Sequence, residues 1–178
     1  QDGQETYMTN TNALGNAWFV SEVLTVKNAD SCILALDRTN FKQSALVEQQ
    51  NSKMGPKKYA TDSSANITLA SYHPEKLVYN SNNSEEGFAV FSEIYYNKGW
   101  KATINGEPAN IENVNFVLRG LELPKGQNEI VFEFKPQSYA LSRAIMLGGN
   151  AVLYLLLGVS LFIWLKKEFL TKDEVAKT

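Results

Sequence analysis

Near its end the chain carries a long stretch without a single charged side chain. Residues 144–165 read AIMLGGNAVLYLLLGVSLFIWL, which is 22 positions. As a helix rising 1.5 Å per residue, this stretch would be about 33 Å long, close to the thickness of the hydrocarbon core of a bilayer. The pattern predicts one membrane-spanning α-helix, and Trp164 near its end is suited to anchor the helix at the membrane interface.

Before this helix the apolar and polar positions alternate, as they do in β-strands. The run FAVFSEIYY places Phe88 and Val90 on one face and Ala89 and Phe91 on the other. Similar runs are ITLASYH, KLVYNSN, GWKATI, NFVLRGLEL and NEIVFEF. An Asn105-Gly106 pair fits a type I′ hairpin turn, whose two central residues need positive φ. Residues 66–142 are therefore predicted to form an antiparallel β-sandwich that is jelly-roll-like.

The beginning of the chain has a mixed pattern. Ala17 to Val26 is rich in Trp, Phe and Val and predicts a strand, Asn28 or Asp30 can cap a short helix after it, and SALVEQ predicts another short strand. We therefore expect five parts. They are a small α+β segment (1–50), a loop (51–65), the sandwich (66–142), the transmembrane helix (144–165) and a tail (166–178).

Basic side chains on either side of the apolar segment predict its orientation. Four lysines follow it and two basic residues precede it: Lys166, Lys167, Lys172 and Lys177, against Lys135 and Arg143. Because the more basic side faces the cytoplasm, we expect a cytoplasmic tail and an extracytoplasmic position for residues 1–142. The opening QDGQETYMTNTN lacks the regions of a signal peptide, so either a removed signal or upstream membrane spans would export it.

Composition argues against several classes of function. The chain has 17 Lys and Arg against 19 Asp and Glu, a net charge of −2, which disfavours nucleic-acid binding. The single cysteine, Cys32, precludes an internal disulfide. We find no calcium loop, no zinc spacing of Cys and His and no glycine-rich phosphate loop, so neither a metal nor a cofactor is predicted.

No group of residues carries the pattern of a catalytic site. His73, the only histidine, precedes Pro74 in an expected turn, and no G-x-S-x-G nucleophile motif accompanies it. Carboxylates such as Glu93 and Glu107 are scattered, whereas a glycosidase needs two of them about 5–9 Å apart across a cleft. The sequence therefore predicts no catalytic residue.

Three aromatic residues surround a tight turn in the segment YYNKGW. Tyr95, Tyr96 and Trp100 are candidate glycan contacts, because aromatic rings on a β-sandwich can stack against sugars. They can also fill the corner of a core. Trp100 and Tyr96 share strand faces with apolar residues, which favours the core for both. Tyr95 lies on the opposite face and suits the core and a ligand surface about equally.

Several segments, in this order, resemble the C-terminal end of bacterial YfhO-type membrane proteins. They are NALGNAWFVSEV, NADSCILAL, FSEIYYNKGWKATINGEPANI, NFVLRGLELPKGQNEIVFEFKPQSY and the closing transmembrane helix, and together they cover nearly the whole chain. The NALGNAWFV opening is similar to the versions found in Bacteroidetes-type bacteria. Proteins of this type are polytopic and resemble GT-C glycosyltransferases, which transfer a sugar from a polyprenyl-phosphate carrier on the outer face of the membrane.

The resemblance implies an extracytoplasmic accessory domain of a glycosyltransferase that lies in the bacterial cell (inner) membrane and modifies the cell envelope. Implied partners are the lipid bilayer, upstream transmembrane helices of the same parent protein, and an envelope glycan or polyprenyl-phosphate sugar. In the GT-C pattern the catalytic acidic residues belong to an early outer loop, which has no counterpart in this sequence. This segment itself is therefore expected to be non-catalytic. The alternative is a membrane-anchored carbohydrate-binding or adhesion ectodomain without enzymatic activity.

Overall fold

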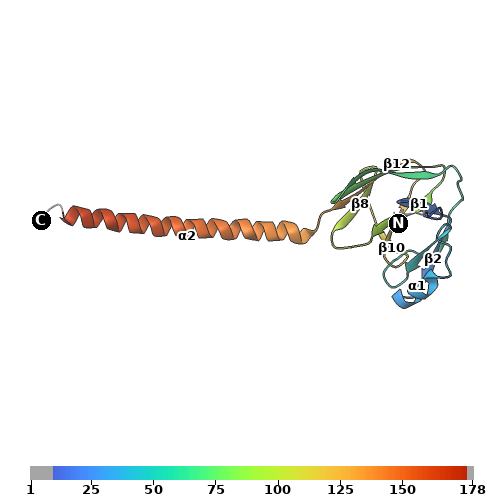
Figure 1. Ribbon diagram of the computed structural model, residues 1–178, viewed down its shortest axis with the longest axis horizontal. Helices are drawn as coiled ribbons and strands as arrows, with labels where there is room; N and C mark the ends of the chain where they lie inside the picture. The colour runs from blue at the N-terminus through green and yellow to red at the C-terminus, as the bar shows by residue number, and fades with distance from the viewer. Residues whose placement is uncertain (1–9, 176–178) are drawn as a thin grey trace, which may run out of the picture. The chain divides into compact units, whose positions relative to one another are not determined.

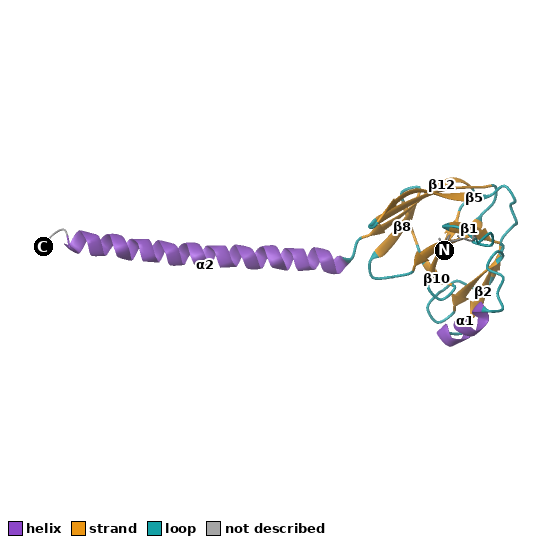
Figure 2. Ribbon diagram, in the orientation of Figure 1, coloured by secondary structure: helices purple, strands orange, loops and turns teal. Residues whose placement is uncertain are grey.

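The computed structural model describes residues 10–175, which form two units. The first unit ends at Lys135 and is built of two β-sheets, and the second begins at Pro136 and is one long helix (Figures 1 and 2). The predicted fold, an α+β start followed by a mostly antiparallel sandwich and a C-terminal apolar helix, is confirmed.

The larger sheet has seven strands in the order β1-β7-β11-β10-β3-β2-β4. Its strands are β1 (Ala17–Val20), β2 (Glu22–Val26), β3 (Ser44–Glu48), β4 (Lys57–Lys58), β7 (Gly87–Ile94), β10 (Glu112–Val114) and β11 (Leu118–Leu123). Neighbours pair antiparallel except β2 and β3, which are parallel and connected through helix α1 (Ala29–Leu36). Asn28, one of the two predicted caps, begins this helix, and its Oδ1 accepts a hydrogen bond from the Ser31 amide at 3.0 Å.

The smaller sheet has five antiparallel strands in the order β5-β6-β12-β8-β9. Its strands are β5 (Asn66–His73), β6 (Lys76–Asn83), β8 (Trp100–Ile104), β9 (Glu107–Ala109) and β12 (Gly126–Phe134). Asn105 and Gly106 connect β8 to β9 with φ values of 53° and 86°, as the predicted type I′ hairpin requires.

The larger sheet curls round on itself. Ser21 alone joins β1 to β2, although β1 lies at one edge of the sheet and β2 lies next to the other edge. Because consecutive Cα atoms are only 3.8 Å apart, the two ends of the sheet must come together. The run Ala17 to Val26, expected as one strand, is therefore broken at Ser21.

Strand β7 separates two hydrophobic clusters. Ala89 and Phe91 on one face pack toward the smaller sheet, and Phe88 and Val90 on the other face pack inside the curl of the larger sheet. Gly120 on the neighbouring strand β11 makes room for the Phe88 ring, since a Cβ atom there would lie 2.5 Å from Phe88 Cζ. The apolar character of both faces of β7 thus reflects its position between two cores.

The N-terminal segment shares its sheet with later strands. Strands β1, β2 and β3, from the expected segment 1–50, lie in one sheet with β7, β10 and β11. Residues 51–65, expected as a loop, contribute β4 and the buried Tyr59. Residues 1–9 of the expected segment lie outside the described residues.

Helix α2 spans Gln137–Val175. Within it, Leu141–Lys167 is long and apolar enough to cross a membrane, and it contains the expected span 144–165. The helix continues into the expected tail, of which residues 176–178 lie outside the described residues.

Candidate functional site

The turn between β7 and β8 forms one wall of an open groove of about 310 Å³. All three candidate aromatics, Tyr95, Tyr96 and Trp100, line this groove. Its other lining residues come from that turn, from β8 and from the segment around β9: Asn97, Lys101, Ala102, Pro108, Ala109, Asn110 and Ile111. The structure thus brings the three predicted residues to one surface, together with two amides and one amine.

Burial of Tyr96 differs from the sequence-based expectation, whereas Trp100 packs against the core cluster as expected. Tyr96, for which the pattern favoured the core, is 50% exposed, whereas Tyr95 and Trp100 are half-buried. The strand β7 ends at Ile94, so the alternation of faces no longer applies at Tyr96. The backbone amide of Tyr95 donates a hydrogen bond to Val117 O at 2.7 Å, which fixes the position of this residue. Burial raises the pKa of the Tyr95 phenol.

Phe134, the last residue of β12, packs against two of the aromatic rings that line the groove. Its ring centroid lies 5.4 Å from that of Trp100 and 6.4 Å from that of Tyr96. Gly99 lets the turn pass over this ring, because a Cβ atom at Gly99 would lie 2.1 Å from Phe134 Cε2. The Lys135 amide also donates to Gly99 O at 2.8 Å. The ring contacts with Phe134 and the hydrogen bond from Lys135 to Gly99 therefore hold the turn and its aromatic rings in place.

A buried arginine lies against the inner side of this group. Arg119 is only 2% exposed, and its guanidinium carbon lies 4.1 Å from the Trp100 ring centroid and 5.2 Å from that of Phe132. Its Nε donates to Ile94 O at 3.0 Å, while its Nη1 has no hydrogen-bond partner among the described residues. Burial lowers the pKa of this guanidinium, and the nearby Glu93 carboxylate opposes that shift.

Arg119 was not among the candidate residues predicted from the sequence. In LRGLEL it alternates with Leu121 and Leu123, both of which are buried in the core. A charged residue in phase with two core leucines was the available signal for a buried arginine.

Comparison of sequences decides the family. The family model described as "Bacterial membrane protein YfhO" matches residues 5–146. The chain belongs to the YfhO family. A curated relative, "Uncharacterized protein YfhO" of Bacillus subtilis (strain 168), is 26% identical over 106 residues, which are 56% of this chain and 12% of that relative. The chain thus spans a small fraction of the length of that YfhO protein, and no solved structure matches it.

Family membership agrees with the apolar helix. Leu141–Lys167 could cross a bilayer by length and composition, and YfhO proteins are bacterial membrane proteins. The resemblance noted in the sequence is therefore confirmed, and this YfhO segment is membrane-associated.

A second depression of this YfhO domain adjoins the aromatic groove. It measures about 660 Å³ and shares Pro108, Ala109 and Asn110 with the groove. Three charged residues, Lys57, Glu112 and Glu122, line its remainder beside uncharged ones. Lys57 forms ion pairs with Glu122 and with Glu86, which lies outside the depression. The accessible surface therefore continues from the aromatic rings past β9 to a charged region.

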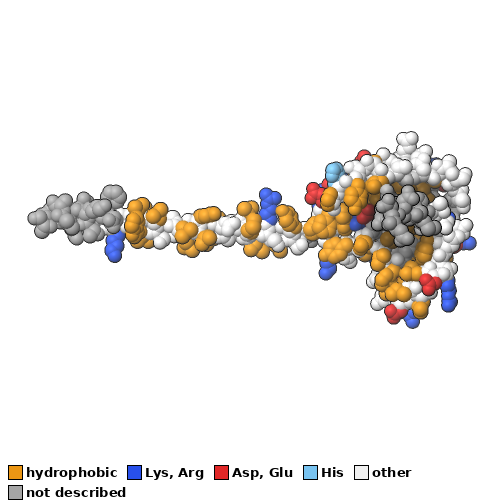
Figure 3. Space-filling model, in the orientation of Figure 1, with side chains coloured by type: hydrophobic (Ala, Val, Ile, Leu, Met, Phe, Trp, Pro, Cys, Tyr) orange, Lys and Arg blue, Asp and Glu red, His pale blue; other side chains and the backbone are white. Residues whose placement is uncertain are grey.

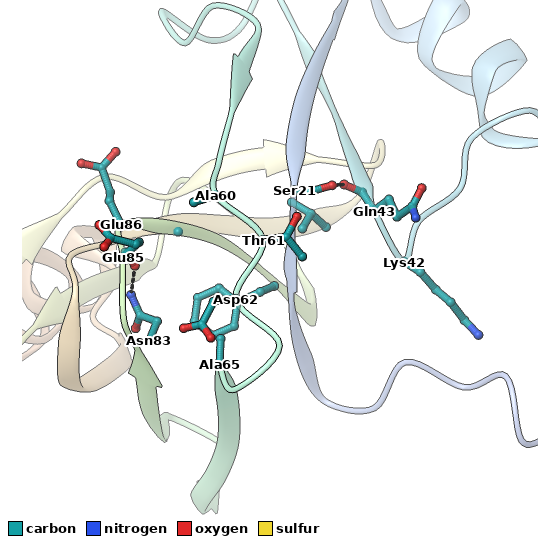
Figure 4. A pocket seen from close by; sticks show the side chains of 13 residues that line it. Ser21, Lys42, Gln43, Ala60, Thr61, Asp62, Ala65, Asn83, Glu85 and Glu86 are labelled. Carbon is teal, nitrogen blue, oxygen red and sulfur yellow. Dashed lines mark hydrogen bonds between the residues drawn. The ribbon is translucent and has the colours of Figure 1, made fainter.

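A third pocket, of about 160 Å³, lies between β1 and the turn that joins β6 to β7 (Figure 4). Asp62 lines it, and the Asp62 carboxylate accepts hydrogen bonds from the backbone amides and hydroxyls of both Ser64 and Ser84. These bonds hold the pKa of Asp62 well below its usual range. Asp62 thus links its own loop to the β6–β7 turn. Its carboxylate is engaged in these hydrogen bonds rather than free to bind a ligand.

Asp62→Asn should make the domain less stable at neutral pH, and the difference from wild type should shrink at acid pH. The Asp62 pKa is depressed in the folded state, so its stabilising contribution is present above the unfolded pKa of about 3.9 and is lost as pH falls below that value. Denaturant unfolding of both proteins at neutral and acid pH measures this. Asp37→Asn is the control, because the exposed Asp37 carboxylate accepts no hydrogen bond among the described residues.

The other candidates for chemistry lie apart from the groove. His73 is the exposed last residue of β5. Within residues 10–175 no three His, Cys, Asp or Glu side chains are grouped so as to hold a metal ion. The aromatic groove is therefore the site on which a function can be argued.

Proposed function

We propose that this YfhO domain is an extracytoplasmic accessory module that binds glycan in the groove of Tyr95, Tyr96 and Trp100. The observation that carries the proposal is the convergence of these three rings with Asn97 and Asn110 in one depression. Aromatic faces stack on the apolar faces of sugar rings, and amides exchange hydrogen bonds with sugar hydroxyls.

The size of the surface favours an oligosaccharide over a single sugar. The groove of about 310 Å³ lies at the lower end of the volumes typical of ligand pockets. The adjoining depression shares Pro108, Ala109 and Asn110 with it and adds about 660 Å³. A glycan chain could stack at the aromatic end and continue past β9.

The placement of the domain outside the cell rests on charge. Lys166 and Lys167 follow the apolar segment directly, and the more basic flank of a membrane helix faces the cytoplasm. We therefore place the sandwich on the outer side of the bacterial cell membrane. A glycan-binding module there would meet envelope polymers.

The activity of the whole protein is proposed as sugar transfer from a polyprenyl-phosphate carrier. It is supported by the resemblance of YfhO-type proteins to GT-C glycosyltransferases, and the matched region is 12% of the Bacillus subtilis relative. The transfer chemistry would reside in the remainder of such a protein. The domain would hold the acceptor glycan, which makes it accessory rather than catalytic.

Tyr96→Ala should weaken glycan binding about tenfold, equivalent to about 1.4 kcal/mol, while leaving the fold intact. Tyr96 is half-exposed and belongs to neither buried cluster, so its ring is available to a ligand. Binding of bacterial envelope oligosaccharides to the full chain in nanodiscs, followed by ligand-observed NMR, measures the effect. Phe116→Ala is the control, because Phe116 is an exposed aromatic residue outside the groove.

Two outcomes would contradict the proposal. Unchanged binding in Tyr96→Ala, or an equal loss in Phe116→Ala, would remove the groove as the site. For the transferase part, the intact parent protein is assayed with polyprenyl-phosphate sugars and envelope acceptors. No consumption of donor, together with unchanged envelope glycans in a deletion strain, would leave a carbohydrate-binding or adhesion ectodomain instead.

A further inference from the structure

Six strand ends meet at one end of the sandwich. Strands β5, β7 and β12 finish there and β6, β8 and β11 start there, as their terminal antiparallel pairs show: His73↔Lys76, Phe134↔Trp100 and Ile94↔Leu118. Two contacts tie these pairs together. The Phe134 amide donates to Glu75 O at 2.8 Å, and Arg119 joins Ile94 O to the Trp100 ring.

This end carries large apolar side chains in the open. Ile94 is 72% exposed, Tyr72 is 62% exposed and Phe134 is 39% exposed. In Figure 3 hydrophobic side chains gather on the sandwich surface beside the histidine, which is His73 at the end of β5. Single exposed apolar residues are ordinary, but several from three strands at one end indicate a contact surface. We call these three residues the apolar end.

The chain itself indicates which partner the apolar end meets. Phe134 is the last residue of β12, and the segment able to cross a membrane begins at Leu141, seven residues later. Even a fully extended chain of that length spans only about 25 Å. The covalent link therefore keeps the apolar end close to any bilayer that α2 crosses.

The side chains suit that environment. Tyrosine is enriched at membrane–water interfaces, where its ring lies among acyl chains and its hydroxyl meets headgroups. Isoleucine and phenylalanine gain from leaving water in the same layer. We propose that the apolar end rests on the headgroup layer of the membrane that α2 crosses, with Tyr72, Ile94 and Phe134 as its contacts. This inference goes beyond glycan binding and does not depend on it.

Contact of the apolar end with the bilayer would also position the aromatic groove. Tyr96 stacks near Phe134, so a domain held at the bilayer by Phe134 keeps the groove within reach of the membrane surface. A glycan would then be bound at the level of the headgroups rather than far from the membrane.

The test uses the full chain in vesicles of phosphatidylethanolamine and phosphatidylglycerol. An environment-sensitive fluorophore is attached at Ile94→Cys, and Cys32 does not compete because it is fully buried. Leu34→Cys is the matched control, since Leu34 is 76% exposed on α1, which packs on β2 and β3. Headgroup spin-labelled lipid should quench the fluorophore at position 94 several-fold more than the fluorophore at position 34.

A second fluorophore position tests whether the bilayer or another protein covers the apolar end. A fluorophore at Tyr72→Cys, on a different strand of the same end, should be quenched as at position 94. Equal quenching at positions 94 and 34 would overturn the proposal. A blue-shifted emission at position 94 without quenching by lipid would also overturn it, in favour of a protein partner such as a second copy or further helices. Glycan binding by the Ile94→Cys protein reports separately on the groove.

Discussion

Phe91→Ala should lower the free energy of unfolding of the sandwich by about 3–5 kcal/mol. Phe91 is fully buried, and its ring centroid lies 4.9 Å from that of Phe132 and 5.0 Å from that of Tyr79, both edge-on. The residue lies on β7, which is paired on both sides, so the backbone cannot move in to fill the cavity. Denaturant unfolding followed by tryptophan fluorescence, in the full chain and in residues 1–135, measures the loss.

Phe116→Ala is the control for this prediction. Phe116 is 37% exposed and belongs to neither core cluster, so removal of its ring should cost about 1 kcal/mol or less. If Phe91→Ala and Phe116→Ala destabilise the domain equally, the aromatic cluster of Phe91, Phe132 and Tyr79 is not a principal source of stability.

Arg119→Ala and Arg119→Met should differ by about 2 kcal/mol or more in the free energy of unfolding. Alanine removes the side chain that fills the space between Trp100 and Phe132, and such large-to-small changes cost about 2–5 kcal/mol. Methionine keeps most of that volume and removes a buried charge whose Nη1 has no partner among the described residues. Replacing buried charges by apolar groups of similar size is often neutral or stabilising.

Equilibrium unfolding of the two variants beside wild type provides the measurement. Arg119→Met should stay within about 1 kcal/mol of wild type, because loss of the bond to Ile94 O offsets part of the gain. A methionine variant as unstable as the alanine variant would contradict this account. It would show that the positive charge itself, through Trp100 and the nearby Glu93 carboxylate, stabilises the fold.

The aromatic groove and the apolar end are different surfaces, and Phe134 takes part in both. Phe134 lies under the groove through its contacts with Tyr96 and Trp100, and it is exposed at the apolar end. A glycan held in the groove and a bilayer under the apolar end would therefore restrain the same few strand ends. A glycan in the groove would then lie close to the membrane surface.

Local features were readable from the sequence because each depends on residues within one element. An uncharged run over 144–165 is sufficient to predict a membrane-length helix. Asn105-Gly106 predicts its hairpin because only certain residues tolerate positive φ at both positions. The three aromatics of YYNKGW were recognised as candidates, and the same segments indicated the YfhO family.

Tertiary structure decided what depends on distant partners. Alternation along β7 could not show that both of its faces are buried, because that follows from the curl of the larger sheet around Ser21. Nor could it show that Tyr96 is exposed, because the strand ends two residues earlier. Periodicity assigns residues to faces, but burial depends on which elements cover each face. The groove therefore emerged only when strands far apart in sequence were brought together.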